Sequence, residues 1–281
     1  MSELESSFFL VQRHGPVAQL SMNRPQKANG MTPDFWTELP RLLGLLDADE
    51  TVRAVVLTGE GKHFTGGMDL EAFASIAALF QQEPGRAAYA FRKKIMQLQD
   101  AFTAIERARF PVIAAIHGAC IGGGIDMISA CDMRLASSDA YFAIEEINIG
   151  MAADVGTLQR LPKLISPAIA AELAYTGRRF RAEEALRIGL LSEVADSREQ
   201  LVKAALALGE RISSKSPLAI AGIKANLAYS RDHGVADGLD YMATWNAGML
   251  RPEDLMNAVQ AAMAKKEAEF ADLLSEGSLA I

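Results

Sequence analysis

Three acidic residues lie in a part of the sequence that otherwise carries little charge. Asp126 follows the run Gly122-Gly123-Gly124, and Glu146 and Asp154 come shortly after it. Apolar surroundings disfavour the ionised form of a carboxyl group, which brings its pKa towards the range where it can accept and donate protons near neutral pH. We therefore interpret the three acids as candidate catalytic residues. Their apolar neighbours are Ile125, Met127, Ile128, Ile147, Ile149, Met151, Ala152 and Val155.

Each acid also has a purely structural interpretation. Asp126 can interact with the first turn of its own expected helix, Glu146 can be solvated beside Glu145, and Asp154 can cap a following helix. The three acids together in apolar segments favour a functional cluster.

Two glycine-rich turns offer backbone N–H groups to a ligand. The run Gly122-Gly123-Gly124 precedes an expected helix, where free N–H groups and the helix dipole favour an anion or a developing oxyanion. Alone it is typical of a tight turn, and no Lys-Ser or Lys-Thr pair follows to make a phosphate loop. A second turn, Gly66-Gly67-Met68, follows another strand. Donors from two such turns can hold a thioester carbonyl and stabilise its enolate.

Other residue types with chemical potential lack a recognisable arrangement. His63 and His117 have no partners for nucleophilic catalysis, and we interpret both as core or loop residues. Cys120 and Cys131 lie in apolar segments without metal-ligand spacing, so we expect neither a disulfide nor a metal site.

Composition describes an ordinary globular protein. Half of the 281 residues are hydrophobic, and 35 acidic against 28 basic residues give a net charge of −7. That sign disfavours nucleic acid as a partner. No charge-free apolar stretch reaches membrane-spanning length, and Met1 to Ser7 does not resemble a signal sequence. We therefore expect a cytoplasmic protein with neither a nucleic-acid nor a membrane partner.

The pattern of elements predicts an α/β core over residues 1–200 and a helical region over 201–281 that packs against it. A hairpin is expected over 8–22, and strands over 52–58, 111–116 and 133–136. Helices are expected from Pro33, capped by Thr32, to about Asp47, over most of 71–107 with a break at 83–85, and from the glycine run to near Cys131. Everything after Val155 looks helical, with helices within 175–186 and over 201–212, 217–229, 236–249 and 252–270.

Several motifs along the chain resemble the enoyl-CoA hydratase/isomerase family, also called the crotonase superfamily. They are Asn23-Arg-Pro25, Phe64-Thr-Gly-Gly-Met-Asp-Leu70, Pro111-Val-Ile-Ala-Ala-Ile-His-Gly118, Gly122-Gly-Gly124, Cys131-Asp132 and Gly156-Thr-Leu-Gln-Arg-Leu161. The resemblance implies a crotonase-like spiral of β-β-α units with a C-terminal α-helical trimerisation region, assembled as a trimer or a dimer of trimers. It implies an acyl-CoA substrate, with coenzyme A as part of the substrate and no separate cofactor. It also implies an oxyanion hole formed by Met68 and Gly123, and substrate contacts from Gly66, Gly67, Met68, Asp69, Leu70 and Gly123.

The acids are similar to those of one subgroup, the Δ3,5-Δ2,4-dienoyl-CoA isomerases. Hydratases of the family typically carry glutamates at the positions matching 126 and 146 and a small residue at 154, whereas this chain has Asp126, Glu146 and Asp154. Leu161-Pro-Lys163, Ser213-Ser-Lys-Ser-Pro217 and Tyr229-Ser-Arg-Asp-His233 extend the similarity. The subgroup shifts the double bonds of 3,5-dienoyl-CoA to 2,4-dienoyl-CoA in fatty-acid beta-oxidation. The alternatives are an enoyl-CoA hydratase, which does not need the third acid, and a noncatalytic acyl-CoA-binding member.

This chemistry moves a proton from C2 to C6, atoms too far apart for one fixed group to serve both. Spacing alone does not say which acid serves C2. From the resemblance to hydratases we assign Glu146 as the C2 base and Asp154 as the C6 donor, with Asp126 tuning both through like-charge repulsion. Lys27 is a candidate for the coenzyme A phosphates or, equally, a solvated loop charge.

Overall fold

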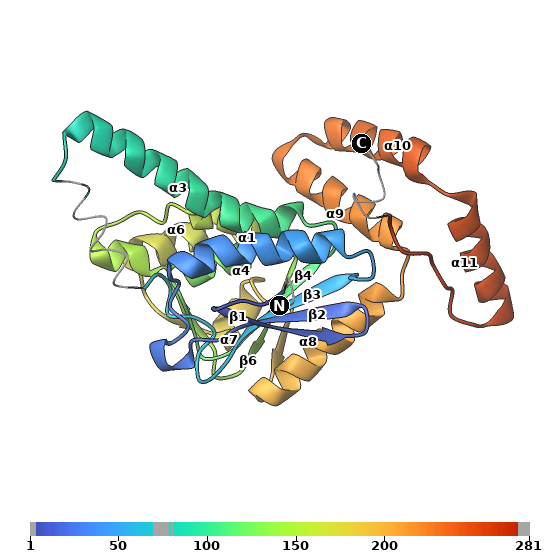
Figure 1. Ribbon diagram of the computed structural model, residues 1–281, viewed down its shortest axis with the longest axis horizontal. Coiled ribbons are helices and arrows are strands. Elements are labelled where there is room, and N and C mark those ends of the chain that lie inside the picture. The colour runs from blue at the N-terminus through green and yellow to red at the C-terminus, as the bar shows by residue number, and fades with distance from the viewer. Residues whose placement is uncertain (1–3, 70–78, 80, 275–281) are drawn as a thin grey trace.

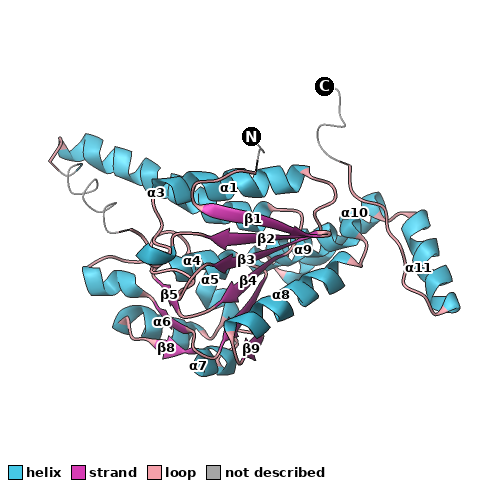
Figure 2. Ribbon diagram, turned by 60° about the horizontal axis from the view of Figure 1, so that its bottom comes forward, coloured by secondary structure: helices cyan, strands magenta, loops and turns pink. Residues whose placement is uncertain are grey.

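A six-stranded sheet forms the centre of the protein (Figure 2). The computed structural model describes residues 4–69, 79 and 81–274. The strand order is β1-β2-β3-β4-β6-β9, antiparallel between β1 and β2 and parallel elsewhere. The strands are β1 (Phe9–His14), β2 (Val17–Met22), β3 (Ala54–Gly59), β4 (Val112–Ile116), β6 (Met133–Ser137) and β9 (Glu193–Ala195).

The predicted hairpin and central strands are confirmed. Strands β1 and β2 turn at Gly15, whose φ of +58° suits glycine. Along β3 the side chains alternate between two cores, with Val55 and Leu57 on one face and Ala54 and Val56 on the other. Both faces are therefore buried, as expected for a parallel sheet covered by helices.

Helices cover the two faces of this sheet unequally (Figures 1 and 2). One face is crossed by α8 (Arg198–Ser213), which packs on β2, β3, β4, β6 and β9 through Leu201 and Ala205. The other carries α1 (Pro33–Ala48), α3 (Pro84–Arg107) and α4 (Gly123–Ala130), with α1 against α3 and α3 against α4. Three shorter helices follow later in the chain, α5 (Thr157–Leu164), α6 (Pro167–Thr176) and α7 (Ala182–Arg187).

A second, three-stranded sheet lies beside the first. It consists of β5 (Ala119–Ile121), β7 (Tyr141–Ala143) and β8 (Phe180–Arg181). Strands this short carry too few residues for a periodic pattern, and the sequence did not predict them. The expectation that everything after Val155 is helical is wrong, because β8 and β9 both lie there.

The last three helices lie at one side of the molecule, and the second and third of them extend away from the body (Figure 1). They are α9 (Pro217–Asp232), α10 (Val235–Met249) and α11 (Pro252–Ala264). Helix α11 ends at Ala264 rather than at the predicted Phe270, because Lys265 adopts a left-handed conformation with φ +54°. The division at residue 200 remains a prediction; α8, which begins at Arg198, packs on the sheet.

The structure changes two predictions about where helices begin, those for α1 and for the helix over 71–107. Thr32 is the N-cap residue of α1, but its side chain makes no capping hydrogen bond. The helix predicted over 71–107 is confirmed only from Pro84, where the Glu83 carboxylate accepts from the N–H groups of Gly85 and Arg86. Residues 70–78 and 80 lie outside the described part.

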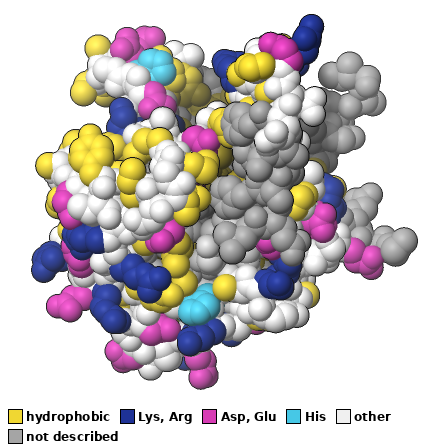
Figure 3. All heavy atoms as spheres, turned by 90° about the vertical axis from the view of Figure 1, so that its left-hand side faces the viewer, with side chains coloured by type: hydrophobic (Ala, Val, Ile, Leu, Met, Phe, Trp, Pro, Cys, Tyr) yellow, Lys and Arg dark blue, Asp and Glu magenta, His cyan; other side chains and the backbone are white. Residues whose placement is uncertain are grey.

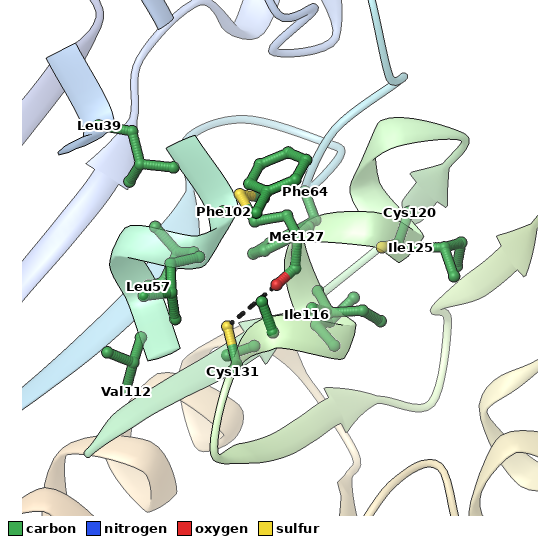
Figure 4. Packing of buried hydrophobic residues seen from close by; sticks show 14 of the residues in the cluster. Leu39, Leu57, Phe64, Phe102, Val112, Ile116, Cys120, Ile125, Met127 and Cys131 are labelled. Atoms are coloured by element: carbon green, nitrogen blue, oxygen red, sulfur yellow. Dashed lines mark hydrogen bonds between the residues drawn. The ribbon is translucent and has the colours of Figure 1, made fainter. Parts of the chain in front are cut away.

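Helix α4 is packed into the larger core by its apolar side chains. Figure 4 shows Met127 of α4 beside Phe64 and Phe102, and the Cys131 thiol donating to the Met127 carbonyl at 3.5 Å. Every residue of α4 is buried. This packing fixes the helix that follows the glycine run.

The surface shows no face of one charge sign in the view of Figure 3, where Lys and Arg side chains alternate with Asp and Glu. Within the described residues, none of the helices combines the length and apolar character needed to cross a membrane.

Candidate active site

The two glycine-rich turns meet at a cavity of about 130 Å³. The Thr65 N–H donates to the Ala119 carbonyl at 2.9 Å, and the Ile121 N–H donates to the Thr65 carbonyl at 3.2 Å. A Cβ on Gly67, whose φ is +87°, would lie 2.8 Å from the Ile121 oxygen and 3.6 Å from the Gly123 nitrogen. Glycine at this position therefore lets the turns approach closely.

The two predicted oxyanion donors line this cavity. The Met31 N–H donates to Gly67 O, and the Asp69 N–H donates to Met31 O. Because successive peptide groups of an extended chain point in opposite directions, the Met68 N–H is directed away from Met31. Gly123 is the first residue of α4, where N–H groups have no partner within the helix. Two backbone donors thus lie at one cavity, as an oxyanion hole requires.

Two of the three predicted acids face the same cavity. Glu146, on the 3₁₀ helix η2 (Glu145–Ile149), and Asp154, just before α5, both line it. A Cβ on Gly122, whose φ is +54°, would lie 3.3 Å from Oε1 of Glu146. Glycine at 122 therefore leaves room for the Glu146 carboxylate beside the start of α4.

Asp126 lies behind the cavity and is fully buried. Its Oδ1 accepts a hydrogen bond from the Thr157 N–H at 2.6 Å, whereas its Oδ2 is buried with no hydrogen-bond partner among the described residues. Asp126 therefore binds the N-terminus of α5, and it also lies in the first turn of its own helix, as the structural interpretation expects. It is absent from the cavity lining, so it is placed to act through its charge.

The pKa values of all three acids are raised. Burial raises the pKa of Glu146 to about 7, and the neighbouring Asp126 adds to the shift. Burial also raises the pKa of Asp126 to about 6, against the opposing hydrogen bond from Thr157. The pKa of Asp154 is raised by burial. Carboxyl groups with such pKa values can exchange protons with weak carbon acids near neutral pH.

Asp154 does not cap the helix that follows it. The N-cap residue of α5 is Gly156, and the N–H group of Thr157 at the helix start is bound by Asp126 rather than by Asp154. The capping interpretation of Asp154 is therefore wrong, and its carboxyl group is left to face the cavity.

Apart from Glu145 and the glycines, apolar side chains form the rest of the cavity wall, the environment that an acyl chain requires. Trp36 is among them and was not foreseen. It lies on the buried face of α1, far from the acids in sequence, and its helical spacing matches that of ordinary core residues. The apolar side chains of the lining are Trp36, Met68, Ile121, Ile149, Met151 and Val155.

Only some of the residues predicted to contact the substrate line the cavity. Gly66, Gly67, Met68 and Gly123 line the cavity. Asp69 forms an ion pair with Arg24 at 3.0 Å instead. Leu70 lies outside the described residues.

Both histidines near the site have structural contacts, as expected. His117 is buried with Nε2 3.1 Å from the Gly61 carbonyl, and Nδ1 of His63 accepts from the Ala119 N–H. Lys27 is exposed on the 3₁₀ helix η1 (Pro25–Lys27). Across the described ranges, no group of three or more His, Cys, Asp or Glu side chains is arranged to hold a metal ion.

A set of hydrogen bonds from one buried side chain, which sequence reasoning missed, supports the loop that carries Met68. Asn29 is fully buried with φ +51°, and its side-chain amide donates to the carbonyls of Glu60, His63 and Phe64. Its Oδ1 accepts from the Arg24 N–H at 2.8 Å. An asparagine two residues before Met31 gives no local sequence signal of this role.

Comparison with known proteins matches the enoyl-CoA hydratase/isomerase family to residues 12–272. The chain belongs to the enoyl-CoA hydratase/isomerase family. A mitochondrial Δ3,5-Δ2,4-dienoyl-CoA isomerase of Rattus norvegicus is 49% identical over 92% of this chain and 79% of its own length. A peroxisomal Δ3,5-Δ2,4-dienoyl-CoA isomerase of Arabidopsis thaliana is 48% identical over 92% of this chain and 93% of its own length.

The fold of this enoyl-CoA hydratase/isomerase family member is shared by solved structures. The crystal structure of an enoyl-CoA hydratase from Bacillus anthracis superposes with a TM-score of 0.86 over 94% of this chain and 99% of that chain, at 28% identity. The predicted crotonase-like α/β fold is therefore confirmed. The predicted similarity to the dienoyl-CoA isomerase subgroup is also confirmed, since relatives of that name are considerably closer in sequence than this hydratase.

Proposed function

We propose that this protein isomerises 3,5-dienoyl-CoA to 2,4-dienoyl-CoA in fatty-acid beta-oxidation. The observation that carries the proposal is one cavity lined by Glu146, Asp154, Met68 and Gly123. Two separate acids beside two backbone donors match a reaction that breaks one C–H bond and forms another at a distance. The names of the similar rat and Arabidopsis proteins support the same reaction.

In the first step, the Met68 and Gly123 N–H groups bind the thioester oxygen. This stabilises the negative charge that develops there when a proton leaves C2. Glu146 takes that proton in its ionised form, and its raised pKa of about 7 makes it a stronger base than an ordinary carboxylate. The electron pair of the broken C2–H bond spreads through the diene as far as C6.

In the second step, Asp154 donates its proton to C6. The π electrons settle between C2 and C3 and between C4 and C5, and the charge leaves the thioester oxygen. Burial raises the pKa of Asp154, which favours the protonated form required of a donor. The substrate formula is unchanged, while Glu146 has gained a proton and Asp154 has lost one. Before the next turnover Glu146 releases its proton to water and Asp154 takes one up from water.

Asp126 is assigned the role of raising the pKa of Glu146. Its charge lies close enough to Glu146 to raise the pKa of that base, and it does not face the cavity. The chemistry uses no cofactor besides the coenzyme A that belongs to the substrate. A third acid has no part in hydration, which disfavours the hydratase alternative.

The test is to give the purified protein a 3,5-dienoyl-CoA and, in parallel, a 2-enoyl-CoA. The absorbance of a diene conjugated with the thioester carbonyl is expected to appear with the first substrate, faster than the enoyl band disappears with the second. Faster loss of the enoyl band would identify a hydratase. Absence of both signals would identify a noncatalytic acyl-CoA-binding protein.

Assembly as a trimer or a dimer of trimers is part of the same proposal. Helices α9 and α10 expose large apolar side chains, and Leu227, Val235 and Leu239 are each more than 60% exposed. Apolar surface of this extent is typical of subunit interfaces. Light scattering on the eluting protein measures the assembly directly, and a monomeric mass would contradict it.

The cytoplasmic location stays a prediction, because the similar isomerases carry the words mitochondrial and peroxisomal in their names. Subcellular fractionation tests it.

A further inference from the structure

The segment that carries Asp154 borders two hollows. One is the active-site cavity, and the other is a polar hollow of about 350 Å³, and Val155 lines both. Helix α3 contributes Gln99, Thr103 and Glu106 to the second hollow. The support for Asp154 therefore comes from a helix distant in sequence.

Gln99 contacts this segment directly. Its Nε2 donates to the Asp154 carbonyl at 2.7 Å, across a separation of 55 residues. Because a carbonyl oxygen only accepts hydrogen bonds, the amide nitrogen of Gln99 must face it. Gln99 is partly buried, so water competes less for this bond than at an exposed site.

A second side chain anchors the next residue to the same helix. Nη1 of Arg160 lies 3.4 Å from the Val155 carbonyl, and its Nη2 donates to Glu106 at 2.8 Å and to Thr103 at 3.2 Å. Burial would raise the pKa of Glu106, but hydrogen bonds from Arg160 and Arg231 outweigh it and lower that pKa. Glu106 is thus held as a charged anchor on α3 for Arg160.

The other end of the segment is fixed as well, because the Thr157 N–H donates to Asp126. The carbonyl groups of Asp154 and Val155 are therefore tied to side chains held on or by α3, and the N–H group of Thr157 is tied to α4. The backbone on the C-terminal side of Asp154 is thus held in place, which limits where its carboxyl group can point.

We propose that Gln99 is a positioning residue that holds the Asp154 backbone so that its carboxyl group reaches the far end of the diene. The inference rests on the proposed function. Gln99 acts on Asp154 and not on Glu146, which is carried by η2 and to which Gln99 makes no hydrogen bond in the described part of the chain. Its loss should impair proton delivery to C6 more than proton removal from C2. A displacement of about 1 Å is enough to slow such a step by about 100-fold.

The test compares Gln99→Met, which keeps the length of the side chain but removes its donor, with Gln97→Met. Gln97 lies on the same helix, is exposed and accepts a hydrogen bond from Lys94, so it serves as the matched control. Two rates are measured with substrate deuterated at C2. Loss of deuterium from recovered substrate reports Glu146, and diene absorbance reports Glu146 and Asp154 together.

For Gln99→Met, the ratio of deuterium loss to diene formation is expected to rise about tenfold or more, towards the ratio of Asp154→Asn. For Gln97→Met it should stay at the wild-type value. A double variant with Asp154→Asn should lose deuterium no more slowly than Asp154→Asn alone, because Gln99 acts through Asp154. If Gln99→Met does not fold, Gln99→Glu removes the donor at the same size, and the same expectations apply.

Full diene formation by Gln99→Met, or an equal fall of both rates at an unchanged ratio, would overturn the positioning role. Failure of the proposed function gives a different result, because wild-type protein would then form no diene at all.

Discussion

Asp126 and Thr157 join the helix after the glycine run to the helix after Asp154. The Thr157 N–H donates to Oδ1 of Asp126 at 2.6 Å, and Oδ2 of the same carboxyl group is buried with no hydrogen-bond partner in the described part of the chain. One oxygen is therefore used by the fold, while the other leaves the carboxylate costly to ionise. This relationship makes Asp126 both a link between α4 and α5 and a source of negative charge behind Glu146.

Asp126→Asn should stabilise the protein at neutral and alkaline pH. The pKa of Asp126 rises from its ordinary 3.8 to about 6 in the folded state, so the folded protein binds this proton more tightly than the unfolded chain. Stability is therefore lost as pH rises from about 4 to about 6, by about 3 kcal/mol at most. Asparagine removes that loss and still offers an oxygen to Thr157. Urea unfolding of both proteins at about pH 5 and about pH 8, at fixed protein concentration, measures the free energy of unfolding. If the variant and the wild type differ in this free energy by the same amount at both pH values, the cost of the buried charge is contradicted.

The same variant should shift the pH dependence of catalysis. After burial, the charge of Asp126 is the next cause that raises the pKa of Glu146 to about 7. Without that charge the ionised base persists to lower pH, so the acid limb of kcat/KM should move to lower pH. Measuring kcat/KM with 3,5-dienoyl-CoA from about pH 5 to about pH 9 locates this acid limb. Complete loss of activity would instead assign Asp126 a direct part in proton transfer.

Asp154→Asn should abolish isomerisation and leave acyl-CoA binding nearly intact. Its carboxyl group faces the cavity and makes no capping hydrogen bond to α5, so only the C6 proton is lost. The expected fall in kcat is about 100-fold or more, the usual contribution of a positioned acid. Binding of a saturated acyl-CoA by calorimetry is the companion measurement, and Asp196→Asn, an exposed acid, is the control. Loss of binding or of thermal stability would make Asp154 structural.

Glu146→Gln should also stop diene formation, together with the loss of deuterium from C2. Glutamine keeps the shape of the side chain beside Gly122 but cannot accept the proton. Both rates should therefore fall together, unlike in Asp154→Asn. Full turnover by this variant would remove Glu146 from the mechanism.

Gly67→Ala should damage the oxyanion hole. A methyl group there would lie 2.8 Å from the Ile121 oxygen and force the two turns apart, in addition to the strain of its positive φ. A fall in kcat of about 100-fold is expected, the effect of losing one oxyanion donor. Gly44→Ala on α1 is the control, since nothing lies within 4 Å of the added carbon and alanine favours a helix by about 0.5–1 kcal/mol. Equal turnover by both variants would show that the turns tolerate separation.

Much of the fold and part of the site were predictable because their signals are local. The β-branched content of residues 52–58, the Pro33 start of α1 and the glycine run before α4 each specify a conformation from neighbouring residues. The acids at 126, 146 and 154 were found because an apolar context is visible in the sequence itself.

Tertiary structure decided which way those acids face and what holds them. Asp126 turned to Thr157 while Glu146 and Asp154 turned to the cavity, and sequence spacing carries no information on such directions. The short β5, β7 and β8 have too few residues for a pattern and exist only through pairing with each other. Trp36 and Gln99 reach the site from α1 and α3 by packing alone. The sequence thus determined the chemical groups and their local backbone, whereas their orientation depended on contacts between segments that only the folded chain brings together.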